Sequence, residues 1–98
     1  MLEKLTANIF EDLTEQVFQL RHENLPDIEA RLIEVRQLSD QTGPAGRTPF
    51  SLLFACPGDT EPVQSTFRLE HEKTGELEVF LVPVGKEDQG LLYEAVFT

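Results

Sequence analysis

The sequence predicts a mainly β fold: a small six-stranded antiparallel barrel or tight sandwich with one short N-terminal α-helix. Six segments alternate apolar and polar residues with a period of two, which is the pattern of half-buried strands. Turn-forming residues separate these segments, and only the start of the chain shows helical spacing. A chain of 98 residues suits one domain, so we expect a single domain over 1–98, with a helical segment at 1–14 and an antiparallel meander at 15–98.

The predicted helix is the stretch KLTANIFEDL, residues 4–13. Thr6 is a suitable N-cap, and Leu5 and Phe10 have the spacing of a hydrophobic staple around it. The apolar side chains of this stretch form one narrow stripe, Ile9, Phe10 and Leu13. A helix of one or two turns is stable only when it packs on the rest of the protein, so we expect it to cover one end or one flank of the barrel.

The six strand segments follow in order along the chain. The residues predicted to face inward are Phe18 and Leu20 in 16–22; Ile28, Ala30, Leu32, Ile33 and Val35 in 27–38; Phe50, Leu52, Phe54 and Cys56 in 49–56; Phe67, Leu69 and His71 in 65–71; Leu77, Val79 and Leu81 in 76–84; and Leu91, Tyr93, Ala95 and Phe97 in 91–97. The alternation in the second segment changes phase after Leu32, which predicts a β-bulge there. Such a bend favours a closed barrel, and closure removes the exposed edges of an open sheet.

One turn predicts the pairing of its two strands. Lys73-Thr74-Gly75 suits a three-residue hairpin loop with glycine in the left-handed conformation. This register places Leu69 opposite Val79, so that both side chains lie on the apolar face.

The charge balance excludes several classes of partner. Eighteen acidic residues against eight basic ones give a net charge of −10 at pH 7. Because such a surface repels phosphate, we expect neither nucleic acid nor an anionic membrane as a partner. We also expect a cytoplasmic protein: no apolar run approaches the roughly 20 residues of a membrane helix, residues 1–4 do not begin a signal peptide, and one cysteine cannot form an intramolecular disulfide.

Cys56, the single cysteine, ends the most apolar run of the chain, PFSLLFAC. Alternation places its side chain on the inward face with Phe54. A nucleophilic thiolate needs a positive neighbour, whereas the following residues, PGDTEP, offer carboxylates. We therefore predict that Cys56 packs in the core and is not a reactive group.

No other residues have the spacing of a catalytic, cofactor or metal site. His22 and His71 fall near strand ends, where we expect partly exposed side chains without a metal. An enzyme would have to draw its polar groups from the two long turns, and the candidates there are Asp40, Arg47 and Asp59. We therefore expect a protein that is not an enzyme and that holds no cofactor.

A second set of apolar residues falls on the face opposite the inward set. Its members are the candidate interface residues Leu53, Phe80, Val82, Val84, Leu92 and Val96. A solvated barrel surface should be polar at these positions, and contiguous exposed apolar surface usually marks an interface. Three explanations are open: the helix and a loop cover this face, the face binds a second copy or another protein, or it lines a ligand pocket. Pro83 lacks a backbone amide and predicts an edge strand or a bulge in the same region.

The chain also resembles a family of short bacterial proteins catalogued as a domain of unknown function. The resemblance rests on the segments MLEKLTANIF, FQLR, IEARLIEVRQL, PFSLLF, FRLEH, GELEVFLVPVG and YEAVF, which occur in this order along nearly the whole chain. It implies no catalytic or binding residues. Members of the family are often encoded near proteins that resemble phage-tail collar or fibre components, which implies a role beside a tail-like or surface assembly.

These observations predict a non-enzymatic protein-interaction or assembly module that binds itself or another protein. The alternative is a small-molecule-binding β-barrel that uses its interior. That alternative needs an unfilled cavity, and the seven phenylalanines of the chain disfavour one, because side chains fill the interior of so small a barrel.

Overall fold

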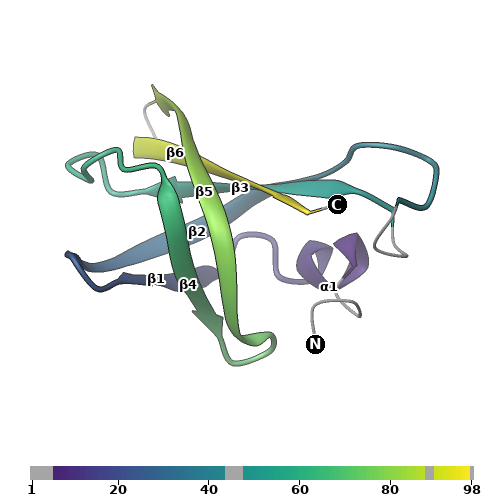
Figure 1. Ribbon diagram of the computed structural model, residues 1–98, viewed down its shortest axis with the longest axis horizontal. Helices are drawn as coiled ribbons and strands as arrows, with labels where there is room; N and C mark the ends of the chain where they lie inside the picture. Colours follow the sequence, from purple (N-terminus) through teal and green to yellow (C-terminus); the bar gives the residue numbers. More distant parts are fainter. Residues whose placement is uncertain (1–5, 44–47, 88–89, 98) are drawn as a thin grey trace.

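The computed structural model describes residues 6–43, 48–87 and 90–97, and in it six antiparallel strands close into a barrel with a short helix at one end (Figure 1). The elements are α1 (Ala7–Glu11), β1 (Val17–His22), β2 (Leu25–Gln37), β3 (Phe50–Cys56), β4 (Ser65–His71), β5 (Gly75–Glu87) and β6 (Gly90–Phe97). The predicted fold class, a six-stranded antiparallel barrel with one N-terminal helix, is confirmed.

The order of strands around the barrel is β1-β2-β3-β6-β5-β4, and β4 pairs with β1 to close it. The single meander predicted for 15–98 is therefore wrong. The chain forms two three-stranded meanders, and the connection at 57–64 carries it from β3 to β4 on the opposite side of the ring. The Tyr93 hydroxyl holds this connection: it donates to the Val63 carbonyl at 2.7 Å and accepts from the Val63 amide at 2.9 Å.

Among the described residues, register shifts occur in three strand pairs, β1–β2, β2–β3 and β5–β6, and bulges of this kind give a sheet the curvature that closure requires. The pairing of β2 with β3 shifts between Leu32 and Glu34, which confirms the bulge predicted near Leu32. The pairing of β5 with β6 shifts between Pro83 and Gly85, so Pro83 marks a bulge. Pro83 also lies beyond Leu81, the last β5 residue in the β4–β5 register.

The β4–β5 hairpin has a register that differs from the predicted one by two residues. His71 pairs with Gly75, so residues 72–74 form the loop and Gly75, with a φ of 70°, begins β5. Leu69 therefore lies opposite Leu77, and the predicted pairing of Leu69 with Val79 is wrong. A shift of two residues keeps every side chain on its own face, so alternation cannot distinguish the two registers.

The inward-facing apolar side chains form the core of the barrel. The residues predicted to face inward are buried, apart from Ile28, Ile33 and Val35 of β2 and His71 of β4, which are half-buried. The helix closes one end of this core: Phe10 has no exposed surface, and its ring centroid lies 5.8 Å from that of Phe50 and 5.7 Å from that of Phe97.

Residues 1–5 of the predicted helical segment 1–14 lie outside the described residues, and within the rest of it the α-helix covers Ala7–Glu11. It begins at Ala7 after Thr6, whose backbone is extended as in an N-cap but whose side chain makes no capping hydrogen bond. The α-helix ends at Glu11, and turns carry the chain to Glu15. Leu5, the predicted staple partner of Phe10, lies outside the described residues.

Candidate interaction surface

The barrel brings the six candidate interface residues onto one side, which we call the outer apolar face: Leu53 of β3, Phe80, Val82 and Val84 of β5, and Leu92 and Val96 of β6. These three strands are neighbours in the sheet, in the order β3-β6-β5. Phe80, Val84 and Val96 are 52%, 50% and 53% exposed. Leu53 and Val82 are half-buried, and Leu92 is buried.

The helix does not pack on this face. Phe10 and Leu13 are buried in the core at the end of the barrel, and the rings that Phe10 contacts belong to the inward residues Phe18, Phe50 and Phe97. The helix therefore covers an end of the barrel, which is one of the two positions predicted for it. In the described part of the chain, the side chains at 80, 84 and 96 keep about half of their surface exposed.

Glu94 lies in the middle of the outer apolar face and was missed by the sequence reasoning. It pairs with Leu53 on one side and with Val82 on the other. Leu92 and Val96 flank it along β6, because residues two apart on a strand share a face. The signal was present in LLYEAVF, where Glu94 alternates with apolar residues, but the order of the strands was needed to show that four aliphatic side chains surround it.

A groove of about 210 Å³ lies on this face beside Glu94. Its lining residues are Glu34, Arg36, Ser51, Leu53, Val84, Leu92 and Glu94. Arg36 is the cation in this lining, and its guanidinium already donates to Glu34, with Nη2 2.9 Å and Nε 3.1 Å from Oε2. Among the described residues, no hydrogen bond or salt bridge engages the Glu94 carboxylate.

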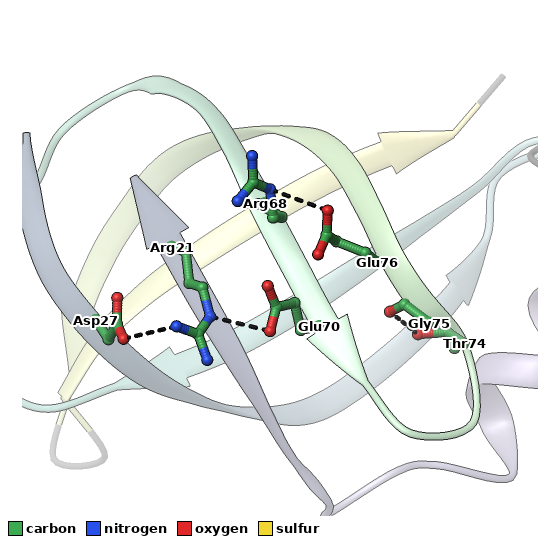
Figure 2. Close-up of polar contacts among 7 residues, drawn as sticks. All are labelled: Arg21, Asp27, Arg68, Glu70, Thr74, Gly75 and Glu76. Atoms are coloured by element: carbon green, nitrogen blue, oxygen red, sulfur yellow. Dashed lines mark hydrogen bonds and ion pairs between the residues drawn. The ribbon is translucent and has the colours of Figure 1, made fainter. Parts of the chain in front are cut away.

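Ion pairs link β1, β2, β4 and the start of β5 on another part of the barrel wall. Figure 2 shows Arg21 of β1 between Asp27 and Glu70, with nitrogen–oxygen distances of 3.1 Å and 2.9 Å. The Arg68 Nε atom of β4 lies 3.2 Å from Glu76 Oε1 of β5, across the two strands. Exposed pairs of this type contribute about 0.2–1 kcal/mol each, so this part of the wall is a solvated polar surface.

The two histidines both stabilise turns. The Nδ1 atom of His22 accepts the Asn24 amide at 3.1 Å, and that of His71 accepts the Lys73 amide at 3.0 Å. An Nδ1 atom that accepts leaves the proton on Nε2, which faces Ser65 Oγ in His22 and Gln16 Oε1 in His71. No cluster of metal-ligating side chains occurs within the described ranges.

Two of the three candidates for an enzyme lie within the described residues, on different connections. Asp40 lies on the connection between β2 and β3, and Asp59 lies on the connection between β3 and β4. Both residues are exposed. Arg47 lies outside the described residues.

Cys56 is 2% exposed, and burial raises the pKa of its thiol to about 12. Above pH 9 the unfolded chain loses this proton while the folded protein keeps it, so stability should fall as the pH rises from about 9 to about 12. Burial of Tyr93 raises the pKa of its hydroxyl and acts in the same direction.

We expect Cys56→Ala to lower the free energy of unfolding by about 1 kcal/mol at pH 7 and to remove part of the alkaline loss. Urea denaturation between pH 7 and pH 11 measures both effects. The native thiol should also resist Ellman's reagent until urea unfolds the protein. Rapid labelling of the native protein would contradict the burial of Cys56.

The fold and this surface define a class of protein: a small closed β-barrel with a helix at one end and an apolar patch on its outer wall. The chain belongs to the family described as "Domain of unknown function (DUF6916)", whose model matches residues 5–97 and confirms the resemblance to a family of unknown function. No curated protein and no solved structure matches the chain. Within the described ranges, no helix has the length and apolar content needed to cross a membrane.

Proposed function

We propose that this protein is a non-enzymatic interaction module that binds a second copy of itself or another protein through the outer apolar face. One observation carries the proposal. About half of the surface of each of Phe80, Val84 and Val96 is exposed, and these residues lie on the neighbouring strands β5 and β6. Single exposed apolar residues are common on protein surfaces, whereas several of them on neighbouring strands favour an interaction site. Phe80 is the aromatic residue of the group, and aromatic side chains often anchor interfaces.

The rest of the molecule supports a binding role more than a catalytic one. Cys56 is buried, and both histidines hold turns with their Nδ1 atoms. Arg21 and Arg68 are paired with carboxylates. A cytoplasmic location is part of the proposal, because the one cysteine is a free thiol. The family resemblance extends the proposal to an accessory role beside a phage-tail-like or surface assembly.

A small-molecule binder that uses the barrel interior is the weaker proposal, because side chains fill that interior. Phe18, Phe54, Phe67 and Tyr93 are at most 1% exposed. Their rings pack in pairs, with centroids 5.4 Å apart for Phe18 and Phe54 and 5.6 Å apart for Phe67 and Tyr93. The outer wall therefore offers the more accessible binding surface.

Site-specific photo-crosslinking in the host cell tests the proposal. A photoreactive phenylalanine analogue at position 80 should yield a covalent adduct of defined mass. The same analogue at position 29 should not, because the exposed Glu29 pairs with Gln19 of β1, away from the three strands of the face. Adding Val96→Lys to the position-80 protein should abolish the adduct without changing the circular dichroism spectrum. Equal adducts at positions 80 and 29, or none at 80, would contradict the proposal.

A further inference from the structure

Glu94 is the feature of the outer apolar face that does not fit a purely hydrophobic contact. Its half-buried carboxylate has an aliphatic neighbour in each direction: Leu53 and Val82 across the strands, Leu92 and Val96 along its own strand. Directly opposed residues on neighbouring strands have Cβ atoms about 5 Å apart, so a partner that covers these side chains also covers the carboxylate.

Covering Glu94 removes it from water. Burying a carboxylate is unfavourable unless the partner supplies a cation or several hydrogen-bond donors. The chain itself offers little compensation, because Arg36, the cation in the groove lining, already binds Glu34. The missing positive charge therefore has to come from the partner.

A second copy of this chain does not meet this requirement. In a twofold-symmetric contact the same face meets itself, which brings the two Glu94 carboxylates into one apolar contact. Each copy also carries a net charge of −10, which adds long-range repulsion. A purely apolar partner fails for a different reason, because it leaves the buried carboxylate unpaired.

We infer that the occupant of the outer apolar face is a different protein, one that presents a lysine or arginine between apolar side chains, with Glu94 as the residue that selects it. This inference rests on the proposed function and deepens it. The aliphatic ring around Glu94 supplies contact area and excludes water, and the carboxylate discriminates among partners by their charge at one position.

The probe is a pair of 11-residue peptides with alternating apolar and threonine residues, identical except for a central lysine or a central glutamate. Binding is followed by the amide chemical shifts of β5 and β6 in the isotope-labelled protein. We expect the wild-type protein to bind the lysine peptide about tenfold more tightly than the glutamate peptide. Glu94→Lys should reverse the preference, and Glu94→Gln should abolish it.

Glu29→Lys is the matched control, because it changes the net charge from −10 to −8 as Glu94→Lys does, but at an exposed site on β2 away from the face. It should retain the wild-type preference for the lysine peptide. If Glu29→Lys and Glu94→Lys change the peptide preference equally, the inference is overturned, since net charge alone would then explain binding. The inference is also overturned if the wild-type protein binds the two peptides equally, or binds neither of them at millimolar concentration.

Sedimentation velocity of the wild-type protein completes the test. We expect the protein to sediment as a monomer both at its highest soluble concentration and after 100-fold dilution. Added salt should not change this oligomeric state. A wild-type dimer that Val96→Lys dissociates would overturn the inference by making a second copy the occupant. Each of these outcomes is compatible with a photo-crosslink at position 80, so it contradicts only the further inference. The absence of that crosslink contradicts the proposed function itself.

Discussion

Gly90→Ala is expected to lower the free energy of unfolding by about 3–5 kcal/mol, a large part of the stability of a domain of this size. Gly90 has a φ of 114°, a conformation that side chains with a Cβ atom rarely adopt. A Cβ atom there would also lie 1.9 Å from the backbone oxygen of Cys56. Backbone strain and overlap with the β3 backbone therefore act together. Urea denaturation monitored by circular dichroism measures the loss.

Gly85→Ala is the matched control for this prediction. Gly85 also belongs to the paired part of β5 and β6, but its φ is not in the left-handed region, and a Cβ atom there would meet no atom within 4 Å. We expect its effect to stay within about 0.5 kcal/mol. If both variants lose a similar amount of unfolding free energy, the close approach of Gly90 to Cys56 is not the cause of the loss.

Phe10→Ala is expected to lower the free energy of unfolding by about 3–5 kcal/mol. Phe10 has no exposed surface and closes one end of the core, where its ring packs on Phe18, Phe50 and Phe97. Its removal leaves a cavity at the end of a barrel that the rest of the short helix cannot fill. The variant should also bind a hydrophobic dye that the wild-type protein does not bind.

Ile9→Ala tests whether this effect comes from the core and not from the helix itself. Ile9 precedes Phe10 in α1 but is 36% exposed. We expect a loss below about 1 kcal/mol and no dye binding. If Ile9→Ala and Phe10→Ala destabilise the protein equally, the loss does not come from the packing of Phe10 at the barrel end, since alanine favours the helix at both positions.

The faces of the strands could be predicted from the sequence with little error. The bulge near Leu32 was also predictable, because a phase change in the apolar pattern has few structural explanations. Cys56 was correctly placed in the core, since its alternation with Phe54 left no outward position for it. These features depend on residues close together in the chain.

Which strands lie side by side in the barrel could not be predicted in the same way. A single meander and the observed order, with β3 beside β6, place the same side chains inside. The register of Leu69 against Leu77 or Val79 was likewise undetermined, because both keep the apolar face intact. Glu94 was missed for the same reason: its aliphatic neighbours Leu53 and Val82 come from strands far away in the sequence.

Two-residue alternation by itself determined which strand side chains face the interior of the barrel and which face outward, because burying apolar groups outweighs most local preferences. Only the closed barrel decided which strands lie side by side, since that choice depends on contacts between distant segments, such as Tyr93 with Val63. The outer apolar face depends on both alternation and strand order. Alternation directs its side chains outward, and the strand order places Leu53 and Val82 beside Glu94.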